Sequence, residues 1–125
     1  MAKEEAILFF ENENPFGISE KMLNRPDVII TDGANPILWF INGVQGVTQV
    51  FDSPKVIDTT GAGDSFLAGL ISQLLSFDYP SNEPEIQNCV KFASICGLLT
   101  CLGEGAIEQQ PDYSKVNKFF GSQIL

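Results

Sequence analysis

Histidine is absent from the 125 residues of this sequence, and cysteine occurs only three times. Without histidine the chain cannot itself supply a Ser–His or Cys–His nucleophilic pair, or histidine ligands for a metal. Cys89, Cys96 and Cys101 are odd in number and lack C-x-x-C spacing, which argues against a disulfide framework and a zinc site. We interpret them as small buried apolar residues, with a reactive thiol as the alternative. Carboxylate and backbone chemistry remain.

Basic residues are also scarce. Seven Lys and Arg against sixteen Asp and Glu give a formal net charge of -9, which opposes binding to nucleic acid and to anionic membrane surfaces. A nucleotide site in such a chain must rely on local amides and metal ions. No apolar run is long enough to cross a bilayer, and the start, Met-Ala-Lys-Glu-Glu, has no basic segment or cleavage site. We therefore expect a cytoplasmic protein.

The chain is of ordinary single-domain size and 44% hydrophobic, enough to bury a core. It shows no internal repeat, low-complexity tract or interior linker, so residues 1–125 are treated as one unit. That length is short for a two-substrate enzyme with a separate lid. Part of a larger enzyme is therefore one hypothesis for this sequence.

Periodicity and turn residues predict the order of elements. The run 28–31 is apolar and β-branched, as is typical of buried parallel strands. Asn42-Gly43 favours a tight hairpin turn, which would bring antiparallel strands into the sheet. The expected elements are helices at 3–10, 19–23 (capped by Ser19), 66–77 and 85–102, strands at 28–31, 37–41, 47–51 and 55–57, a loop at 12–17, a turn at 32–36 and a final amphipathic segment at 114–120.

Residues 58–64, Asp-Thr-Thr-Gly-Ala-Gly-Asp, lie between the expected strand and the expected helix 66–77. Two glycines around one alanine leave peptide N–H groups uncovered, and a helix start adds unpaired donors and partial positive charge. A phosphate, or the charge that develops in phosphoryl transfer, would be stabilised there. Asp64 places a carboxylate beside this anion site, where it could accept a proton from an attacking hydroxyl. The pairing suggests a kinase.

Two better-known glycine motifs fit less well. A nucleoside triphosphatase loop requires a lysine after its last glycine, and Asp64-Ser65 follow here. A dinucleotide-binding fingerprint requires a third glycine, and Phe66 occupies that place. A lone glycine pair before a helix is weak evidence for either.

The longer string Asp58 to Phe66, DTTGAGDSF, closely resembles the second signature of the ribokinase-like carbohydrate kinases, the PfkB family. Residues 28–33 are similar to the strand and T-x-G turn that precede it, and Gly105-Ala106 to the pair near the nucleotide pocket. The resemblance covers nearly the whole chain and is closest to the fructokinase branch. It implies the C-terminal half of a three-layer α/β sandwich, with a mostly parallel sheet that includes a hairpin.

The resemblance also implies an activity, ATP-dependent transfer of the γ-phosphoryl group to a sugar hydroxyl. Asp64 would be the general base, and the amides of Gly61, Ala62 and Gly63 would form the anion hole. This agrees with the interpretation of the residues themselves. The expected partners are ATP and a small sugar.

Further positions would hold the nucleotide and its ions. The resemblance places Thr31, Gly33, Gly105 and Ser94 along ATP, Asp58 and Thr60 at a monovalent cation such as K⁺, and Glu5 near Mg²⁺. The sequence departs from the family where Ala2 replaces the asparagine of the N-x-x-E motif, and where Asn35-Pro36 replace a second glycine. Ser94 stands where the family often has an asparagine.

Structural interpretations stay open beside these roles. An aspartate in a first helical turn commonly interacts with the helix dipole, worth roughly 0.3 to 1 kcal/mol. Asp58 could satisfy turn amides, and the turn after Thr31 could be only a turn. A truncated, catalytically inactive nucleotide-binding or assembly module is the alternative function. By the resemblance an N-terminal half is missing, so we also expect oligomers or association with that half.

Overall fold

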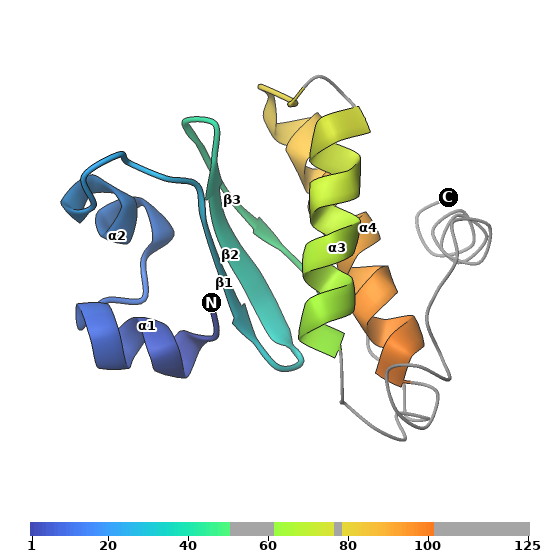
Figure 1. The fold of residues 1–125 in the computed structure, drawn as a ribbon, viewed down its shortest axis with the longest axis horizontal. Coiled ribbons are helices and arrows are strands. Elements are labelled where there is room, and N and C mark those ends of the chain that lie inside the picture. The colour runs from blue at the N-terminus through green and yellow to red at the C-terminus, as the bar shows by residue number, and fades with distance from the viewer. Residues whose placement is uncertain (51–61, 77–78, 102–125) are drawn as a thin grey trace. The chain divides into compact units, whose positions relative to one another are not determined.

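The computed structural model describes residues 1–50, 62–76 and 79–101 (Figure 1). The chain divides into two compact units, residues 1–50 with 79–87, and residues 51–78 with 88–125. The expected strand 55–57 and the segment 114–120 lie outside the described residues. The described elements, in order, are α1 (Lys3–Phe10), α2 (Pro15–Lys21), β1 (Val28–Asp32), β2 (Asn35–Ile41), β3 (Val44–Thr48), α3 (Ala62–Ser76) and α4 (Glu83–Cys101).

The sheet of the first unit has the strand order β1-β2-β3, with antiparallel pairing throughout. The predicted hairpin is confirmed: Asn42 and Gly43 have φ values of 49° and 80° and join β2 to β3. Positive φ at both central residues is what a type I′ turn requires, and such a turn matches the twist of the flanking strands. β3 begins at Val44, three residues earlier than expected, because the two-residue turn lets pairing start at once.

β1 occupies the apolar run that is typical of parallel strands, yet it pairs antiparallel with β2. Among the described residues, a parallel partner of β1 is present at the chain start, where Ala2 bridges to Thr31. The N–H of Thr31 donates to the Met1 carbonyl oxygen (3.0 Å), and the Met1 amino group donates to the carbonyl oxygen of Ile29 (2.8 Å). β1 therefore has an antiparallel neighbour in β2 and a parallel bridge to Ala2. Sequence periodicity alone does not distinguish parallel from antiparallel pairing.

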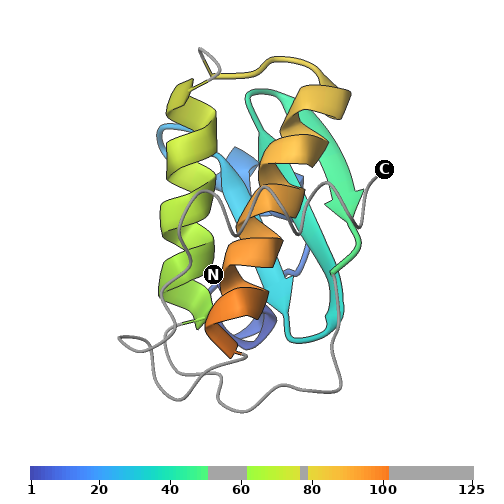
Figure 2. The ribbon, with the colours of Figure 1, turned by 90° about the vertical axis from the view of Figure 1, so that its right-hand side faces the viewer.

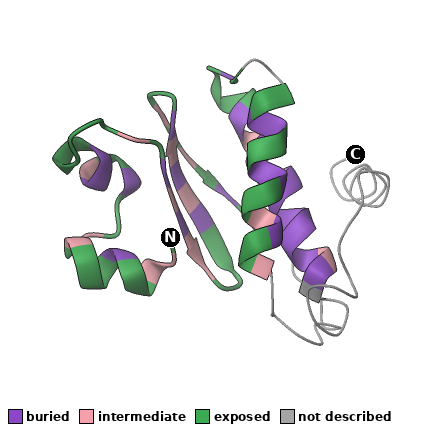
Figure 3. Ribbon diagram, in the orientation of Figure 1, coloured by how far each residue is buried: buried purple, intermediate pink, exposed green. Residues whose placement is uncertain are grey.

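One face of this sheet packs on the two N-terminal helices. Ala6 of α1 and Ile18 of α2, each 0% exposed, form a core cluster with Val28 and Ile30 of β1. Figure 3 shows α1 as mostly exposed with a buried stretch, and α2 as a mixture of buried and exposed positions. α1 has the bounds that the sequence predicts.

The loop expected at 12–17 is wrong in its second half, because α2 begins at Pro15. The Asn14 side chain caps this helix by accepting hydrogen bonds from the N–H groups of Phe16 (3.0 Å) and Gly17 (3.3 Å). Proline at the first helical position is pre-organised and loses no needed donor. Ser19 is not the cap: it is buried inside α2 and its hydroxyl donates to the Pro26 carbonyl oxygen (2.7 Å).

The start of α4 is tied to the sheet within the first unit. The buried Trp39 Nε1 donates to the Thr48 hydroxyl (2.9 Å), which donates to Gln87 Oε1 (2.6 Å). Gln87 Nε2 donates to the carbonyl oxygen of Val47 (2.6 Å). The Trp39 ring lies against Gly46, where a Cβ would collide with it. These contacts join the N-terminal part of α4 to β3.

In the second unit, α3 and the following part of α4 run side by side (Figure 2). Glycines allow the close approach: a Cβ on Gly69 would lie 2.7 Å from Cys96 Sγ, and one on Gly97 would lie 3.2 Å from the Ala62 carbonyl oxygen. α3 begins at Ala62, four residues before the predicted start, because apolar periodicity begins only at Phe66. The glycine motif therefore continues into the helix itself.

Candidate functional site

The first turn of α3 carries the described part of the glycine motif. Ala62 is half-buried and Gly63 and Asp64 are exposed, whereas Ser65 is buried. The first amides of a helix have no acceptor within that helix, so those of Ala62, Gly63 and Asp64 have no partner inside α3. A Cβ placed on Gly63 would meet no atom of the described residues within 4 Å, so these residues leave open space beside Gly63.

This turn combines donors and a base within three residues. The N-terminal donors and the helix dipole favour an anion, and the exposed Asp64 carboxylate lies beside them on the same turn. In such an arrangement the amides can stabilise negative charge while the adjacent Asp64 carboxylate accepts a proton. Four further candidates, Asp58, Thr60, Gly61 and Gly105, lie outside the described residues.

A second group of candidates lies where β1 ends, in the first unit. Thr31 is half-buried, and its hydroxyl lies 3.5 Å from the carbonyl oxygen of Met1, a weak contact. Gly33 is exposed and has a φ of +56°, a left-handed value that favours glycine. The turn is tighter than the expected 32–36, since β2 already begins at Asn35. The backbone of Gly33 is therefore accessible at the end of a strand.

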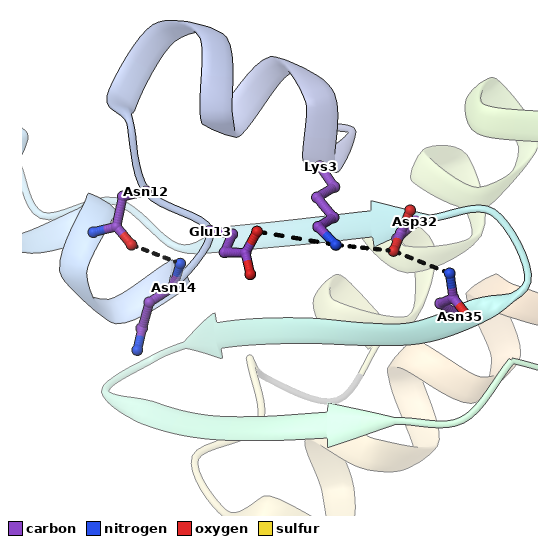
Figure 4. A network of polar contacts seen from close by, with 6 residues as sticks. All are labelled: Lys3, Asn12, Glu13, Asn14, Asp32 and Asn35. Carbon is purple, nitrogen blue, oxygen red and sulfur yellow. Dashed lines mark hydrogen bonds and ion pairs between the residues drawn. The ribbon is translucent and has the colours of Figure 1, made fainter.

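Sequence reasoning missed a polar network beside this turn (Figure 4). Lys3 Nζ lies 3.6 Å from Asp32 Oδ2 and 3.9 Å from Glu13 Oε2, and Asn35 Nδ2 donates to Asp32 Oδ2 (3.1 Å). Asp32 lies in the turn that the sequence analysis singled out. Lys3 begins helix α1 and Glu13 lies in the loop after it, and no residue spacing in the sequence indicated that they would meet Asp32.

The network borders a pocket of about 260 Å³. Its floor is apolar and comes from one row across the three strands, since Ile30 pairs with Leu38 and Leu38 with Val47. The Lys3 ammonium lies between two carboxylates at the rim, so the pocket has a charged edge and an apolar base.

Glu5, the candidate for magnesium, caps α1: its Oε1 accepts a hydrogen bond from the Ala2 N–H (2.9 Å). Its carboxylate is exposed. In the described part of the chain, no three His, Cys, Asp or Glu residues gather as a metal site would require. Mg²⁺ is commonly held by one or two carboxylates together with substrate phosphates, so a single exposed carboxylate fits that mode and not a closed protein cage.

Two other candidates lie on α4. Ser94 is buried, 6% exposed. Cys89 and Cys96 are buried, as the sequence predicted, whereas the side chain of Cys101 lies outside the described part of the chain. Burial raises the pKa of the Cys96 thiol to about 11. A thiol with so high a pKa is protonated at neutral pH and is a poor nucleophile, which supports the structural interpretation of Cys96.

Comparison with known proteins identifies the family. Residues 4–112 match the family described as "pfkB family carbohydrate kinase". The chain belongs to this family. The resemblance carried by the glycine motif is thereby confirmed, and with it the expectation of a sugar kinase family with fructokinase relatives.

Two relatives are 35% and 31% identical to this chain over the aligned residues. A sugar kinase of Dictyostelium discoideum is 35% identical over 118 residues, 89% of this chain and 30% of the relative. Fructokinase of Vibrio alginolyticus is 31% identical over 121 residues, 94% of this chain and 39% of the relative. The chain thus spans about a third of the length of these kinases.

A solved structure extends the comparison to the fold. A double mutant of fructokinase from Vibrio cholerae O395, with fructose, ADP and potassium ion bound, matches 94% of this chain and 38% of its own, at 26% identity and a TM-score of 0.77. The ribokinase-like α/β fold class is therefore confirmed, and the small antiparallel sheet with its helices is part of it. Among the described helices, none is long and apolar enough to cross a membrane. The cytoplasmic location stays a prediction.

Proposed function

We propose that this chain carries the phosphoryl-transfer part of an ATP-dependent sugar kinase of the fructokinase type. The observation that carries the proposal is the first turn of α3, where open amides and the exposed Asp64 carboxylate lie together in a chain of the PfkB family. Fructokinase relatives, one of them with fructose and ADP bound, support the choice of sugar and nucleotide.

In the proposed reaction Asp64 accepts the proton of a sugar hydroxyl as its oxygen attacks the γ-phosphorus of ATP. The bond from the sugar oxygen to phosphorus forms, the bond from phosphorus to the β–γ bridging oxygen breaks, and ADP leaves with that electron pair. The amides of Gly61, Ala62 and Gly63 donate hydrogen bonds to the oxygens of the transferred phosphoryl group, over which the negative charge is spread in the transition state.

The remaining candidates would hold the nucleotide and its ions. Thr31 and Gly33, with Gly105 and Ser94, would lie along ATP. Glu5 would help to bind Mg²⁺ together with the phosphates of ATP. Asp58 and Thr60 would hold a monovalent cation near the anion hole. Potassium ion bound to the Vibrio cholerae fructokinase supports a cation of this kind. These ions supply positive charge that offsets the negative charge of the polyphosphate.

Replacing Asp64 by asparagine tests the general base. The chain would be assayed with ATP, Mg²⁺, K⁺ and fructose, alone and together with the part of Vibrio alginolyticus fructokinase that it does not match, which by the family resemblance is the N-terminal part. General-base catalysis typically contributes roughly 10²- to 10⁴-fold, so we expect Asp64→Asn to lower turnover by about that factor with little change in ATP affinity. Turnover that survives Asp64→Asn would show that another group takes the proton.

An inactive nucleotide-binding or assembly module is the second candidate, favoured by the short span of the chain relative to its relatives. It predicts that ATP binds, as measured by calorimetric titration, while no phosphorylated sugar forms in either mixture. Turnover in the mixture with the N-terminal part would exclude this candidate.

A further inference from the structure

The first turn of α3 is anchored to α4 by a pair of buried hydroxyl groups. Thr100 Oγ1 donates to Ser65 Oγ (2.7 Å), and the Cys96 carbonyl oxygen, 3.2 Å away, is the alternative acceptor for the single hydroxyl proton. Thr100 is 0% exposed and Ser65 is 6% exposed, so no solvent competes for this contact. Ser65 is the residue that follows Asp64.

Gly97 brings the backbone of α4 against the same turn. A Cβ at this position would lie 3.2 Å from the Ala62 carbonyl oxygen and 3.7 Å from the Cβ of Phe66. A side chain there would press on the turn, so a glycine permits the observed distance. Farther along α3, a Cβ on Gly69 would lie 2.7 Å from Cys96 Sγ, and the close contact thus continues along the pair of helices (Figure 2).

This anchoring has a geometric consequence for Asp64. Successive residues of a helix are about 100° apart, so the buried Ser65 faces α4 while the neighbouring Asp64 is exposed. The first turn of a helix lacks half of its hydrogen bonds and tends to fray. Fixing the inward residue therefore also fixes the direction in which the outward carboxylate points.

We propose that Thr100, through Ser65, is a positioning residue for Asp64, and that Gly97 provides the space for this contact. The inference rests on the proposed role of Asp64 as general base. A hydrogen bond is directional, so a buried pair of hydroxyls holds the first turn of α3 in one orientation relative to α4. Apolar side chains of the same size would allow the turn to shift against α4. Catalysis is sensitive to displacements of about 1 Å, which can cost roughly 10²-fold in rate.

The test compares Thr100→Val, which keeps the shape and removes the hydroxyl, with Thr100→Ser, which keeps the hydroxyl. Amide hydrogen exchange of Phe66 and Leu67, whose helical acceptors are the carbonyls of Ala62 and Gly63, reports on the turn. We expect Thr100→Val to speed their exchange on the order of five- to tenfold, the size of one net hydrogen bond. Thr100→Ser should restore slow exchange, and amides in the middle of α3 should not change.

A matched control removes another hydroxyl from the same helix. Ser76 is exposed near the end of α3 and its hydroxyl donates to the Ser72 carbonyl oxygen (2.8 Å). Ser76→Ala should leave exchange at the first turn as in the unchanged chain. If Thr100→Val also leaves that exchange unchanged, the proposal is overturned, whether or not the chain turns over substrate.

Turnover in the mixture with the N-terminal part gives the second measurement. We expect Thr100→Val to lower kcat by roughly 10- to 100-fold with KM for ATP near its original value. Because Thr100 acts through Asp64, Thr100→Val should have little further effect on kcat once Asp64→Asn is present. If the two substitutions lower kcat by independent factors that multiply in the double variant, the positioning role of Thr100 is contradicted and the proposed function is not. Turnover that survives Asp64→Asn contradicts the proposed function instead.

Discussion

At the scale of single residues, Gly63 differs from the other glycines of the helices. A Cβ on Gly69 or Gly97 would meet the neighbouring helix, while one on Gly63 would meet no atom of the described residues within 4 Å. Packing within this described part of the chain therefore does not require the lack of a side chain at Gly63. An open amide at a helix start is a physical reason for glycine at this position, and it agrees with the predicted anion hole.

Gly63→Val should consequently weaken function without weakening the fold. Valine would shield the amides, and losing one anion-hole donor typically costs about 10²- to 10³-fold in kcat. Helix propensities of glycine and valine differ by only a few tenths of a kcal/mol, so urea unfolding should hardly change. Ser72→Val, at another exposed position of α3, is the control and should leave ATP affinity and turnover as they were. Unchanged ATP affinity and turnover in Gly63→Val would remove the support for the anion hole.

At the scale of elements, hydrogen bonds between distant segments decide where α4 begins on the sheet. Thr48 is 1% exposed, and its hydroxyl both accepts from Trp39 and donates to Gln87. The contacts span 9 and 39 residues of sequence. Such pairs leave no periodic signal, which is why the helix could be predicted from the sequence and its attachment could not.

Gln87→Leu tests this attachment. Leucine has a similar size but removes the acceptor of the buried Thr48 hydroxyl and the donor to the Val47 carbonyl, and an unsatisfied buried group costs about 1 to 3 kcal/mol. We expect the free energy of unfolding, from urea denaturation, to fall by about that amount. Asn88→Leu changes the exposed neighbour and should lie within about 0.5 kcal/mol of the original chain. Equal stability of the two variants would show that the network adds nothing.

At the scale of the whole molecule, large apolar side chains remain exposed in both units. Leu23 is 97% exposed, Leu8 and Phe9 of α1 are 73% and 70% exposed, and Leu75 of α3 is 73% exposed. Single exposed apolar residues are ordinary, but adjacent ones such as Leu8 and Phe9 suit an interface. The chain spans about a third of its relatives' length, so further polypeptide is the expected cover for such surfaces.

We therefore expect the chain alone to self-associate. In sedimentation velocity, the weight-average sedimentation coefficient should rise with protein concentration. The rise should be steeper at high salt, because the net charge of -9 makes the chains repel one another at low salt. Replacing Leu8 and Phe9 by serine should reduce it, whereas replacing the exposed Glu4 by glutamine should not. A monomer at all concentrations and salt levels would contradict this prediction.

The sequence by itself determined the features that depend on neighbouring residues. The string from Asp58 to Phe66 was sufficient to indicate the family, and the Asn42-Gly43 turn and α1 follow from local backbone preferences. Where local signals conflicted, the prediction was wrong: a cluster of turn residues hid the start of α2 at Pro15.

Only the tertiary structure decided which distant groups meet. It paired β1 antiparallel with β2, placed Lys3 between Asp32 and Glu13, and joined Ser65 to Thr100 across 35 residues. These contacts depend on how helices and strands pack, since burial and hydrogen bonding are satisfied by partners far away in the sequence. The glycine motif could therefore be recognised from the sequence, while the contacts that hold its first helical turn could not.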